Sequence, residues 1–258
     1  MVSPSQPAPD FVRLAGHPLR WRMLTELARG DLRVRELVAL LGEPQSLVSY
    51  HLRLLRSGGL VTAGRSSFDG RDSYYHLDLD RCAEALADTG AALHPMLRPP
   101  PPPPPPPPEV TVPVGVLFVC TGNSARSPIA EALLRHRTGG RVAVASAGIS
   151  PKAALHPEAV RALREGFGID LAGQSPRPLA AVLDRRFDHV ISLCDKAREA
   201  LTDLPGRPRL AHWSIADPAA AAGAGHRAFR NTAAEIDNRV RHLVPVLAAT
   251  HPVKEIQP

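Results

Sequence analysis

Cysteine and aromatic residues are scarce in this chain of 258 residues, and each scarcity excludes a class of protein. The three cysteines, Cys82, Cys120 and Cys194, are too few and too scattered for the disulfide framework of a small secreted domain. Because there is no Cys-x-x-Cys pair and no Cys/His cluster, we expect no metal site. Aromatic residues make up only 4% of the chain, so its cores must be built mainly from Leu, Val and Ala.

Long hydrophobic runs are also lacking. The longest apolar stretch, "VTVPVGVLFVC", is too short to cross a bilayer as a helix, which takes about 20 residues. The N-terminal "MVSPSQPAPD" has neither the basic start nor the apolar segment of a secretory signal. We therefore expect no membrane partner and a cytoplasmic location.

Charge is not concentrated in either half. The net charge of +6 permits nucleic-acid binding, but residues 1–98 carry 12 basic and 11 acidic side chains, so bulk charge does not identify a DNA-binding half. Only locally, within residues 11–71, do ten arginines face five acidic residues. Any DNA-binding surface must therefore be located from the pattern of elements.

A run of ten prolines, Pro99–Pro108, divides the chain. Such a run forms an extended polyproline II rod that rises about 3.1 Å per residue and spans roughly 30 Å. We read it as a stiff spacer; a docking site for a proline-recognition domain is the alternative. The predicted organisation is listed in chain order: a disordered N-terminus (1–10), a first domain (11–98), a linker (99–112), a second domain (113–250) and a tail (251–258).

The first domain shows helical periodicity followed by two short strands. The helical segments are "HPLRWRMLTELARG", "RVRELVALLG" and "PQSLVSYHLRLLRSGG", the last two ending at glycines. The first segment places Leu19, Met23, Leu24 and Leu27 on one face. The strands "LVTAGRSS" and "SYYHLDL" are joined across "FDGRD", in which the pair Asp69-Gly70 indicates a turn. This order predicts a winged helix-turn-helix, mainly α with a β wing.

The third helical segment is the candidate DNA-recognition helix. Val48, Leu52 and Leu55 would pack inward, and the remaining face would meet the major groove while the wing approaches phosphates. The candidate contacts to operator DNA are Gln45, Ser46, Ser49, Tyr50, His51, Arg53, Arg65 and Arg71. The alternative is an interaction domain that uses the same fold without DNA.

Residues 11–80 resemble the ArsR family of dimeric winged-helix repressors, which leave DNA when they bind a metal or metalloid. The resemblance rests on "HPLRWRML", "VSYHLRLLRSGGLV" and "SYYHLDL", and it implies a homodimer whose dimer helix contains Cys82. Many members carry "ELCVCDL", with paired metalloid-binding cysteines, where this chain has "GDLRVREL". Arg33 and Arg35 cannot be soft ligands, so that sensing site is absent. Cys82 is either a plain buried cysteine or a partner of the same residue in a second subunit.

The second domain opens on "VGVLFVCTGNSARSPIAEALLRH", in which Cys120 ends a buried strand and Arg126 precedes a helix with Pro128 near its start. The loop between them can form a cradle of backbone N–H groups at a helix N-terminus, which attracts anions. Cys120 would be held there as a nucleophilic thiolate, and Arg126 would bind two oxygens of a tetrahedral oxyanion. The remaining residues of this predicted oxyanion-binding loop are Thr121, Gly122, Asn123, Ser124, Ala125 and Ser127.

This arrangement resembles the low-molecular-weight protein tyrosine phosphatase superfamily, which includes thioredoxin-coupled arsenate reductases, over about Val114 to Ala249. The resemblance implies a three-layer α/β domain of the phosphotyrosine-phosphatase-I type with a small parallel sheet. In "HWSIADPAAA", Asp217 stands before Pro218 at the general-acid position of the superfamily. Asn123 matches the asparagine that orders the loop.

Two features favour the reductase branch. Alanines follow Asp217 where the phosphatases usually carry tyrosines that hold an aromatic substrate, and "DHVISLCDKAREAL" resembles the reductase segment that bears a second, resolving cysteine, here Cys194. The third cysteine of the thioredoxin-coupled reductases is replaced by Leu201. An external reductant, thioredoxin or a low-molecular-weight thiol, would then restore the enzyme, with no bound cofactor. Arg177 stands near the acidic position of a run that helps to hold a cation in the family's reductases, so cation dependence is not carried over.

The sequence thus predicts an arsenate reductase that converts arsenate to arsenite with Cys120, Arg126, Asp217 and Cys194, fused to an ArsR-type DNA-binding regulator. The alternative is a protein tyrosine phosphatase or an oxyanion-sensing domain fused to a transcription factor. In that case Cys194 would be a structural residue.

Overall fold

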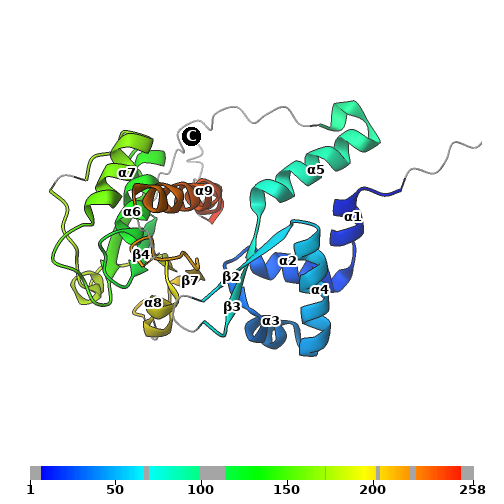
Figure 1. Ribbon diagram of the computed structural model, residues 1–258, viewed down its shortest axis with the longest axis horizontal. Helices are drawn as coiled ribbons and strands as arrows, with labels where there is room; N and C mark the ends of the chain where they lie inside the picture. The colour runs from blue at the N-terminus through cyan, green and yellow to red at the C-terminus, as the bar shows by residue number, and fades with distance from the viewer. Residues whose placement is uncertain are drawn as a thin grey trace, which may run out of the picture. The chain divides into compact units, whose positions relative to one another are not determined.

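The computed structural model describes residues 7–66, 70–98, 114–171, 173–201, 204–220 and 225–250. The chain divides into two compact units, Met1–Pro104 and Pro105–Pro258 (Figure 1). The predicted linker at 99–112, the predicted tail at 251–258, residues 1–6 of the predicted N-terminus and Asp69 of the predicted turn lie outside the described residues.

The first unit is a winged helix-turn-helix, as predicted. Its helices are α1 (Asp10–Ala15), α2 (Pro18–Leu27), α3 (Val34–Leu41), α4 (Gln45–Ser57) and α5 (Leu79–Leu93), followed by the 3-10 helix η1 (Pro95–Leu97). Three antiparallel strands lie in the order β1 (Leu32–Arg33), β3 (Ser73–Leu77), β2 (Val61–Arg65). Helix α1 begins at Asp10, one residue before the predicted start of the domain.

Local sequence explains where the helices of this unit end. Gly42 follows α3 in the left-handed conformation, with a φ of 70°, which glycine adopts without steric cost. The predicted inner faces are confirmed, because the following side chains are buried in one core: Leu19, Met23, Leu24, Leu27, Val48, Leu52 and Leu55. Full burial of such a side chain contributes about 1.5–3 kcal/mol each. The core therefore fixes which face of α4 remains exposed.

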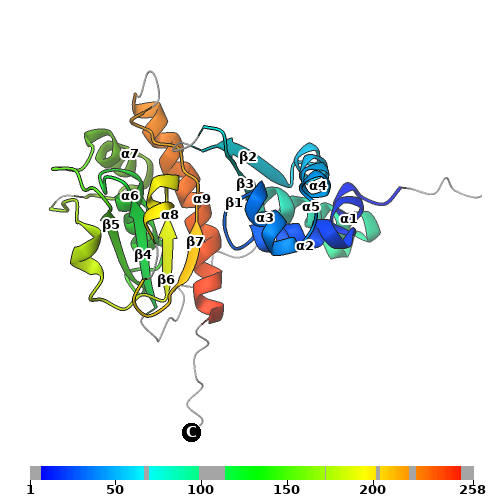
Figure 2. The same ribbon diagram turned by 90° about the horizontal axis from the view of Figure 1, so that it is seen from below.

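The second unit has the predicted α/β fold. Its four parallel strands lie in the order β5 (Ala143–Gly148), β4 (Gly115–Cys120), β6 (His189–Ser192), β7 (Arg209–His212). The helices are α6 (Arg126–Arg137), α7 (Pro157–Phe167), η2 (Leu179–Val182), α8 (Asp195–Ala200) and α9 (His226–Thr250). Helix α9 packs on α6 and α7, and α6 packs on β4 and β5. Figure 2 shows the four strands side by side with the helices packed around them.

The parallel sheet decides where a site can form. All six residues of β4 are buried, as expected for a central parallel strand covered by helices. Because neighbouring strands run in the same direction, their carboxyl ends meet at one edge, which is where such folds bind ligands. Cys120 ends β4, Cys194 follows β6, and Asp217 follows β7. The topology thus brings three predicted site residues to the same edge.

Within the described ranges, no helix is both long and apolar enough to span a membrane.

Candidate active site

The Cys120 thiol lies at the floor of the loop that joins β4 to α6. Its residue is 2% exposed, and its Sγ accepts a hydrogen bond of 3.2 Å from the backbone N–H of Asn123. The hydroxyl oxygen of Ser127 lies 3.0 Å from the same sulfur. Both groups can donate a hydrogen bond to the sulfur, which is the contact that the predicted nucleophile needs.

Asn123 holds the turn of this loop. Its φ of 46° lies in the left-handed region, which asparagine tolerates better than most residues. Its side-chain nitrogen donates to Ser127 Oγ at 2.9 Å and to Ser146 Oγ at 2.8 Å, while its side-chain oxygen accepts from the Arg177 backbone N–H at 2.7 Å. The side chain of Asn123 therefore ties the loop to α6, to β5 and to the segment before η2.

A second segment, residues 149–156, runs beside the loop and orients its peptides. Four of its N–H groups donate to loop carbonyls at 2.8–3.1 Å: Ile149 to Cys120, Ser150 to Thr121, Lys152 to Gly122 and His156 to Ser124. The two segments of the backbone approach closely at Gly148, where a Cβ atom would lie 2.8 Å from the carbonyl oxygen of Thr121. The carbonyls are thus turned toward residues 149–156, whereas the Asn123 N–H turns toward the sulfur.

The N-terminus of helix α6 adds partial positive charge at the same loop. Its N-cap is Ala125, which makes no side-chain capping hydrogen bond. The first amides of a helix carry partial positive charge and need an acceptor. A tetrahedral oxyanion bound above Cys120 would supply that acceptor.

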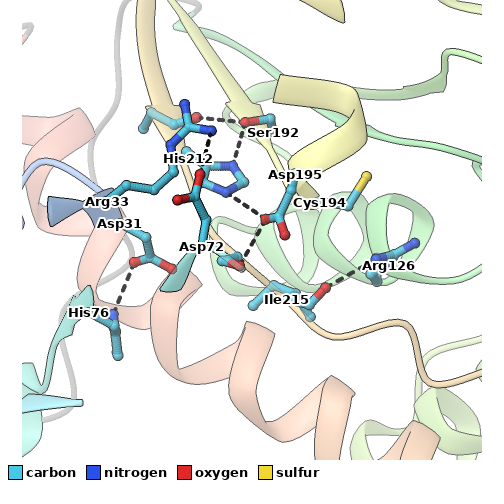
Figure 3. Close-up of polar contacts among 12 residues, drawn as sticks. Asp31, Arg33, Asp72, His76, Arg126, Ser192, Cys194, Asp195, His212 and Ile215 are labelled. Carbon is cyan, nitrogen blue, oxygen red and sulfur yellow. Dashed lines mark hydrogen bonds and ion pairs between the residues drawn. The ribbon is translucent and has the colours of Figure 1, made fainter. Parts of the chain in front are cut away.

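The guanidinium of Arg126 reaches across to the segment that follows β7. Its side chain is 6% exposed, and it donates to the carbonyl of Ile215 at 3.0 Å (Figure 3). It also donates to Oδ2 of Asp217 at 2.8 Å. The other carboxylate oxygen of Asp217 accepts from the Ala219 N–H at 3.0 Å. Arg126 and Asp217, predicted as the oxyanion clamp and the general acid, are therefore in direct contact.

Cys194 stands beside the same loop. It is the N-cap residue of α8, is 2% exposed, and its Sγ lies 3.3 Å from Oγ1 of Thr121, the residue next to Cys120. Leu201, at the position of the third cysteine, is 8% exposed and belongs to the core. The fold thus brings the second thiol to the nucleophile loop and packs an apolar side chain where the third would be.

Residues 115–254, more than half of the chain, match the family model described as low molecular weight phosphotyrosine protein phosphatase. The chain belongs to this family. Residues 17–63 match the model described as bacterial regulatory protein, arsR family. The two resemblances found in the sequence are thereby confirmed.

Curated relatives match the phosphatase-family domain over nearly their whole length. An arsenate reductase from Halalkalibacterium halodurans is 34% identical over 129 residues, which cover 49% of this chain and 91% of the relative. A glutaredoxin arsenate reductase from Synechocystis sp. is 32% identical over 129 residues, covering 50% of this chain and 95% of the relative. A solved structure described as an arsenate reductase in the phosphate binding state is 30% identical, with a TM-score of 0.45, and covers 52% of this chain and 98% of that one.

A buried carboxylate supports the oxyanion loop of the phosphatase-family domain from behind. Glu131 is 2% exposed, and its Oε2 accepts from Ser146 Oγ and from Arg177 Nη2, both at 2.6 Å. Its other oxygen accepts from Arg135 at 2.5 Å. Because Ser146 also accepts from Asn123, an unbroken series of hydrogen bonds links Arg177 to the loop. A buried carboxylate needs such paired partners.

A second buried cluster, which sequence reasoning missed, lies next to Cys194 (Figure 3). Oδ1 of Asp195 lies 3.1 Å from His212 Nε2 and accepts from Ser214 Oγ at 2.9 Å, while His212 Nδ1 lies 2.8 Å from Ser192 Oγ. This cluster ties the turn that bears Cys194 to the segment leading toward Asp217. An aspartate directly after the second cysteine and a histidine at the end of a strand were the available signals.

No group of three or more His, Cys, Asp or Glu side chains suited to a metal ion occurs in the described part of the chain.

The predicted DNA-contacting residues are not all placed as expected. The side chains of Gln45, Ser46, Tyr50, Arg53, Arg65 and Arg71 are exposed, and Ser49 is half-buried. His51 is only 5% exposed; its ring centroid lies 4.5 Å from that of His17, and its Nδ1 lies 3.5 Å from an Arg20 nitrogen. The prediction that His51 contacts DNA is wrong, because a helical turn places it on the same inner face as Val48, Leu52 and Leu55.

Ion pairs occupy the position of the ArsR metalloid site. Oδ2 of Asp72 lies 3.5 Å from an Arg33 nitrogen and 3.3 Å from an Arg35 nitrogen, and the Arg33 guanidinium lies 5.4 Å from the centre of the Tyr74 ring. Cys82, on α5, is half-buried, and burial, followed by the nearby Asp78 charge, raises its pKa to about 11. The Cys82 thiol is therefore protonated at neutral pH, and the other residues of this region carry no sulfur.

Proposed function

We propose that this chain is an arsenate reductase fused to an ArsR-type DNA-binding regulator. Residues 11–98 form the regulator, 113–250 form the reductase, and 99–112 link them. The contact of 3.3 Å between Thr121 Oγ1 and Cys194 Sγ carries the proposal, because it places a second thiol at the loop of the nucleophile. A phosphatase does not need that thiol. The relatives named as arsenate reductases support the same function.

The first step joins arsenate to the enzyme. Arsenate binds to the loop N–H groups and to the guanidinium of Arg126. The thiolate of Cys120 attacks arsenic, a sulfur–arsenic bond forms, and one arsenate oxygen leaves as water after Asp217 donates a proton. The product of this step is a Cys120–arsenate adduct in which arsenic is still As(V).

The second step reduces arsenic. Cys194, as a thiolate, attacks the Sγ of Cys120, so that a disulfide forms and the sulfur–arsenic bond breaks. The bonding electron pair leaves with arsenic, which becomes As(III) and departs as arsenite after protonation. Two thiol groups of an external reductant then return Cys120 and Cys194 to thiols. The two electrons that arsenic gains must in any case come from outside the chain, and with Leu201 at the position of a third reactive cysteine the external thiols act directly on the Cys120–Cys194 disulfide.

The regulator works as a homodimer on operator DNA in this proposal. Helix α5 and the residues around it expose several large apolar side chains: Val12, Leu86, Leu93, Met96 and Leu97. A second copy of the chain that packs on α1 and α5 would cover them. Charged substitution of Leu86 should then convert the dimer to a monomer in sedimentation and weaken operator binding.

The alternative function is phosphate-ester hydrolysis by the same loop. Cys120, Arg126 and Asp217 would serve both reactions, since each needs a nucleophile, an oxyanion clamp and a proton donor. The segment after Asp217 argues against a tyrosine phosphatase, because Ala219 and Ala220 offer no aromatic surface for a phenol ring.

Turnover of the purified full-length protein tests the proposal. Arsenate is supplied in parallel with a thioredoxin system and with small thiols, alongside hydrolysis of an aryl phosphate. We expect arsenite from the wild type with at least one reductant, none from Cys120→Ser, and undiminished arsenite from the control Cys82→Ser. Aryl phosphate hydrolysis without arsenite would establish the alternative and return Cys194 to a structural role.

A further inference from the structure

Lys152 lies over the oxyanion loop. Its backbone N–H donates to the carbonyl of Gly122 at 2.9 Å, and its side-chain stem covers the same glycine. A Cβ atom built on Gly122 would lie 3.1 Å from Cγ of Lys152 and 3.8 Å from its Cε. The ammonium is one bond beyond Cε and is therefore within reach of the rim of the loop. Lys152 is exposed, and it makes no ion pair among the described residues.

The charges at the floor of the site create a need for such a cation. The guanidinium of Arg126 is paired with the carboxylate of Asp217 at 2.8 Å, so part of its positive charge is already compensated. A dianionic oxyanion that binds beside this pair therefore gains from one further cation at the rim of the loop.

We propose that Lys152 is a specificity-determining residue that binds the outward-facing oxygen of a small inorganic oxyanion. Three oxygens of arsenate or phosphate fill the cradle of N–H groups and Arg126, and the fourth points to the mouth. In an inorganic oxyanion this fourth oxygen is free to accept from the ammonium. In an aryl ester it carries an apolar ring, which would have to displace the lysine stem from Gly122. Lys152 therefore favours inorganic oxyanions over aryl esters.

The chain offers a matched control. Lys196, in the first turn of α8 and two residues after Cys194, is also exposed and forms no ion pair among the described residues. Neutralising it changes the net charge of the domain by the same amount as neutralising Lys152. A general electrostatic effect would thus appear in both variants, and a contact of Lys152 in only one.

The first test is calorimetric binding of inorganic phosphate to the full-length protein and to Lys152→Gln, Lys152→Arg and Lys196→Gln. Loss of one charge-assisted hydrogen bond should weaken phosphate binding by about tenfold in Lys152→Gln. Lys152→Arg should retain most of the affinity, and Lys196→Gln should lose less than about twofold. Equal losses in the two glutamine variants, or no loss in Lys152→Gln, would overturn the proposal.

The second test addresses specificity with phenylphosphonate, an aryl oxyanion that is not hydrolysed. Lys152→Gln should bind it as well as the wild type or better, so the ratio of phosphate to phenylphosphonate affinity should fall about tenfold. An unchanged ratio would contradict the proposed selectivity. The extension to arsenate rests on the proposed reductase function, whereas both binding tests do not. If the protein reduces no arsenate but gives the expected results in both binding tests, the proposed reductase function is wrong and the inference about Lys152 still holds.

Discussion

The Nη2 atom of Arg126 donates a hydrogen bond of 2.8 Å to Oδ2 of Asp217, and its Nη1 donates to the carbonyl of Ile215 at 3.0 Å. The proposed oxyanion clamp and the proposed proton donor are thus bound to each other. An oxyanion that takes both guanidinium nitrogens must replace these two acceptors. Its arrival would release Asp217 toward the oxygen that leaves.

Asp217→Asn should separate the two roles of this pair. We expect kcat to fall by about 10²–10⁴, the usual cost of losing a general acid. Phosphate affinity should be unchanged or higher, because the carboxylate that competes for Arg126 is gone. Steady-state kinetics and calorimetry measure the two effects. Asp237→Asn is the control, since Asp237 pairs with Arg137 at 2.6 Å. A lower phosphate affinity in Asp217→Asn would contradict the competition.

Thr121→Val should slow the second thiol step without affecting the first. The valine keeps the shape of threonine but cannot contact Cys194 Sγ through a hydroxyl. With a contact worth about 0.5–1.5 kcal/mol, we expect arsenite release in a single turnover to slow by roughly 2- to 10-fold. Rapid mixing with arsenate, followed by acid quench, measures both adduct formation and release. Equal slowing of the two steps would mean that Thr121 acts only on the loop.

Arg177→Gln should loosen the oxyanion loop. The change leaves the buried Glu131 with fewer partners and breaks the connection through Ser146 to Asn123. We expect a loss of about 1–2 kcal/mol in the free energy of unfolding of this domain. The rate of alkylation of Cys120 by iodoacetamide should change as well, and Arg177→Lys should restore part of it.

Arg135→Gln is the control for Arg177→Gln. Arg135 donates to the other oxygen of Glu131. A purely structural role would give both variants the same alkylation rate. Only Arg177 should alter it, because its side-chain pair with Glu131 anchors the same residue whose backbone N–H donates to Asn123.

Cys82 should resist alkylation at neutral pH. Burial, and then the Asp78 charge, raise its pKa to about 11, so only a small fraction is thiolate at pH 8. We expect its modification by iodoacetamide to accelerate about tenfold per pH unit between pH 8 and 10. Mass spectrometry of peptides from the native protein follows Cys82 separately from Cys120. A rate that is flat over this range would show that the thiol is already ionised.

The winged helix should lose stability on mild acidification because of His51. Burial, then His17 and Arg20, lower the pKa of His51 in the folded protein. The unfolded chain, in which histidine titrates near about 6.5, then binds the proton more strongly. The free energy of unfolding should fall as the pH drops through 6.5 toward the folded pKa. Hydrogen exchange of α4 amides measures it, and His51→Gln should flatten the dependence.

The site residues that could be predicted from the sequence are those that belong to short local motifs. The spacing of Cys120 and Arg126 lies within one strand–loop–helix segment, so it could be recognised without knowing the fold. Asp217 was found through the adjacent Pro218 in the same way. His51 was included among the candidate DNA contacts, whereas helical geometry puts it on the buried face of Leu52 and Leu55. The helical periodicity of the apolar residues in α4 predicts the burial of His51 correctly.

The supporting contacts were not predictable, because they join residues that only the sheet brings together. Asp195 and His212 belong to different elements, and nothing in their separation along the chain fixes a distance of 3.1 Å. The same holds for Glu131 and Arg177, which are 46 residues apart. Buried polar partners of this kind depend on the register of strands, which the local sequence leaves open.

The ion pairs of Asp72 with Arg33 and Arg35 bear on how the fused chain is controlled. A repressor with paired cysteines at this position would bind arsenite, the product of the proposed reductase domain. The product of one domain would then act on the other domain of the same chain. With two guanidinium groups in that place, rising arsenite leaves this part of the regulator unaltered. At this position, arsenite formed by the proposed reductase domain would therefore find no pair of thiols through which to act on the regulator.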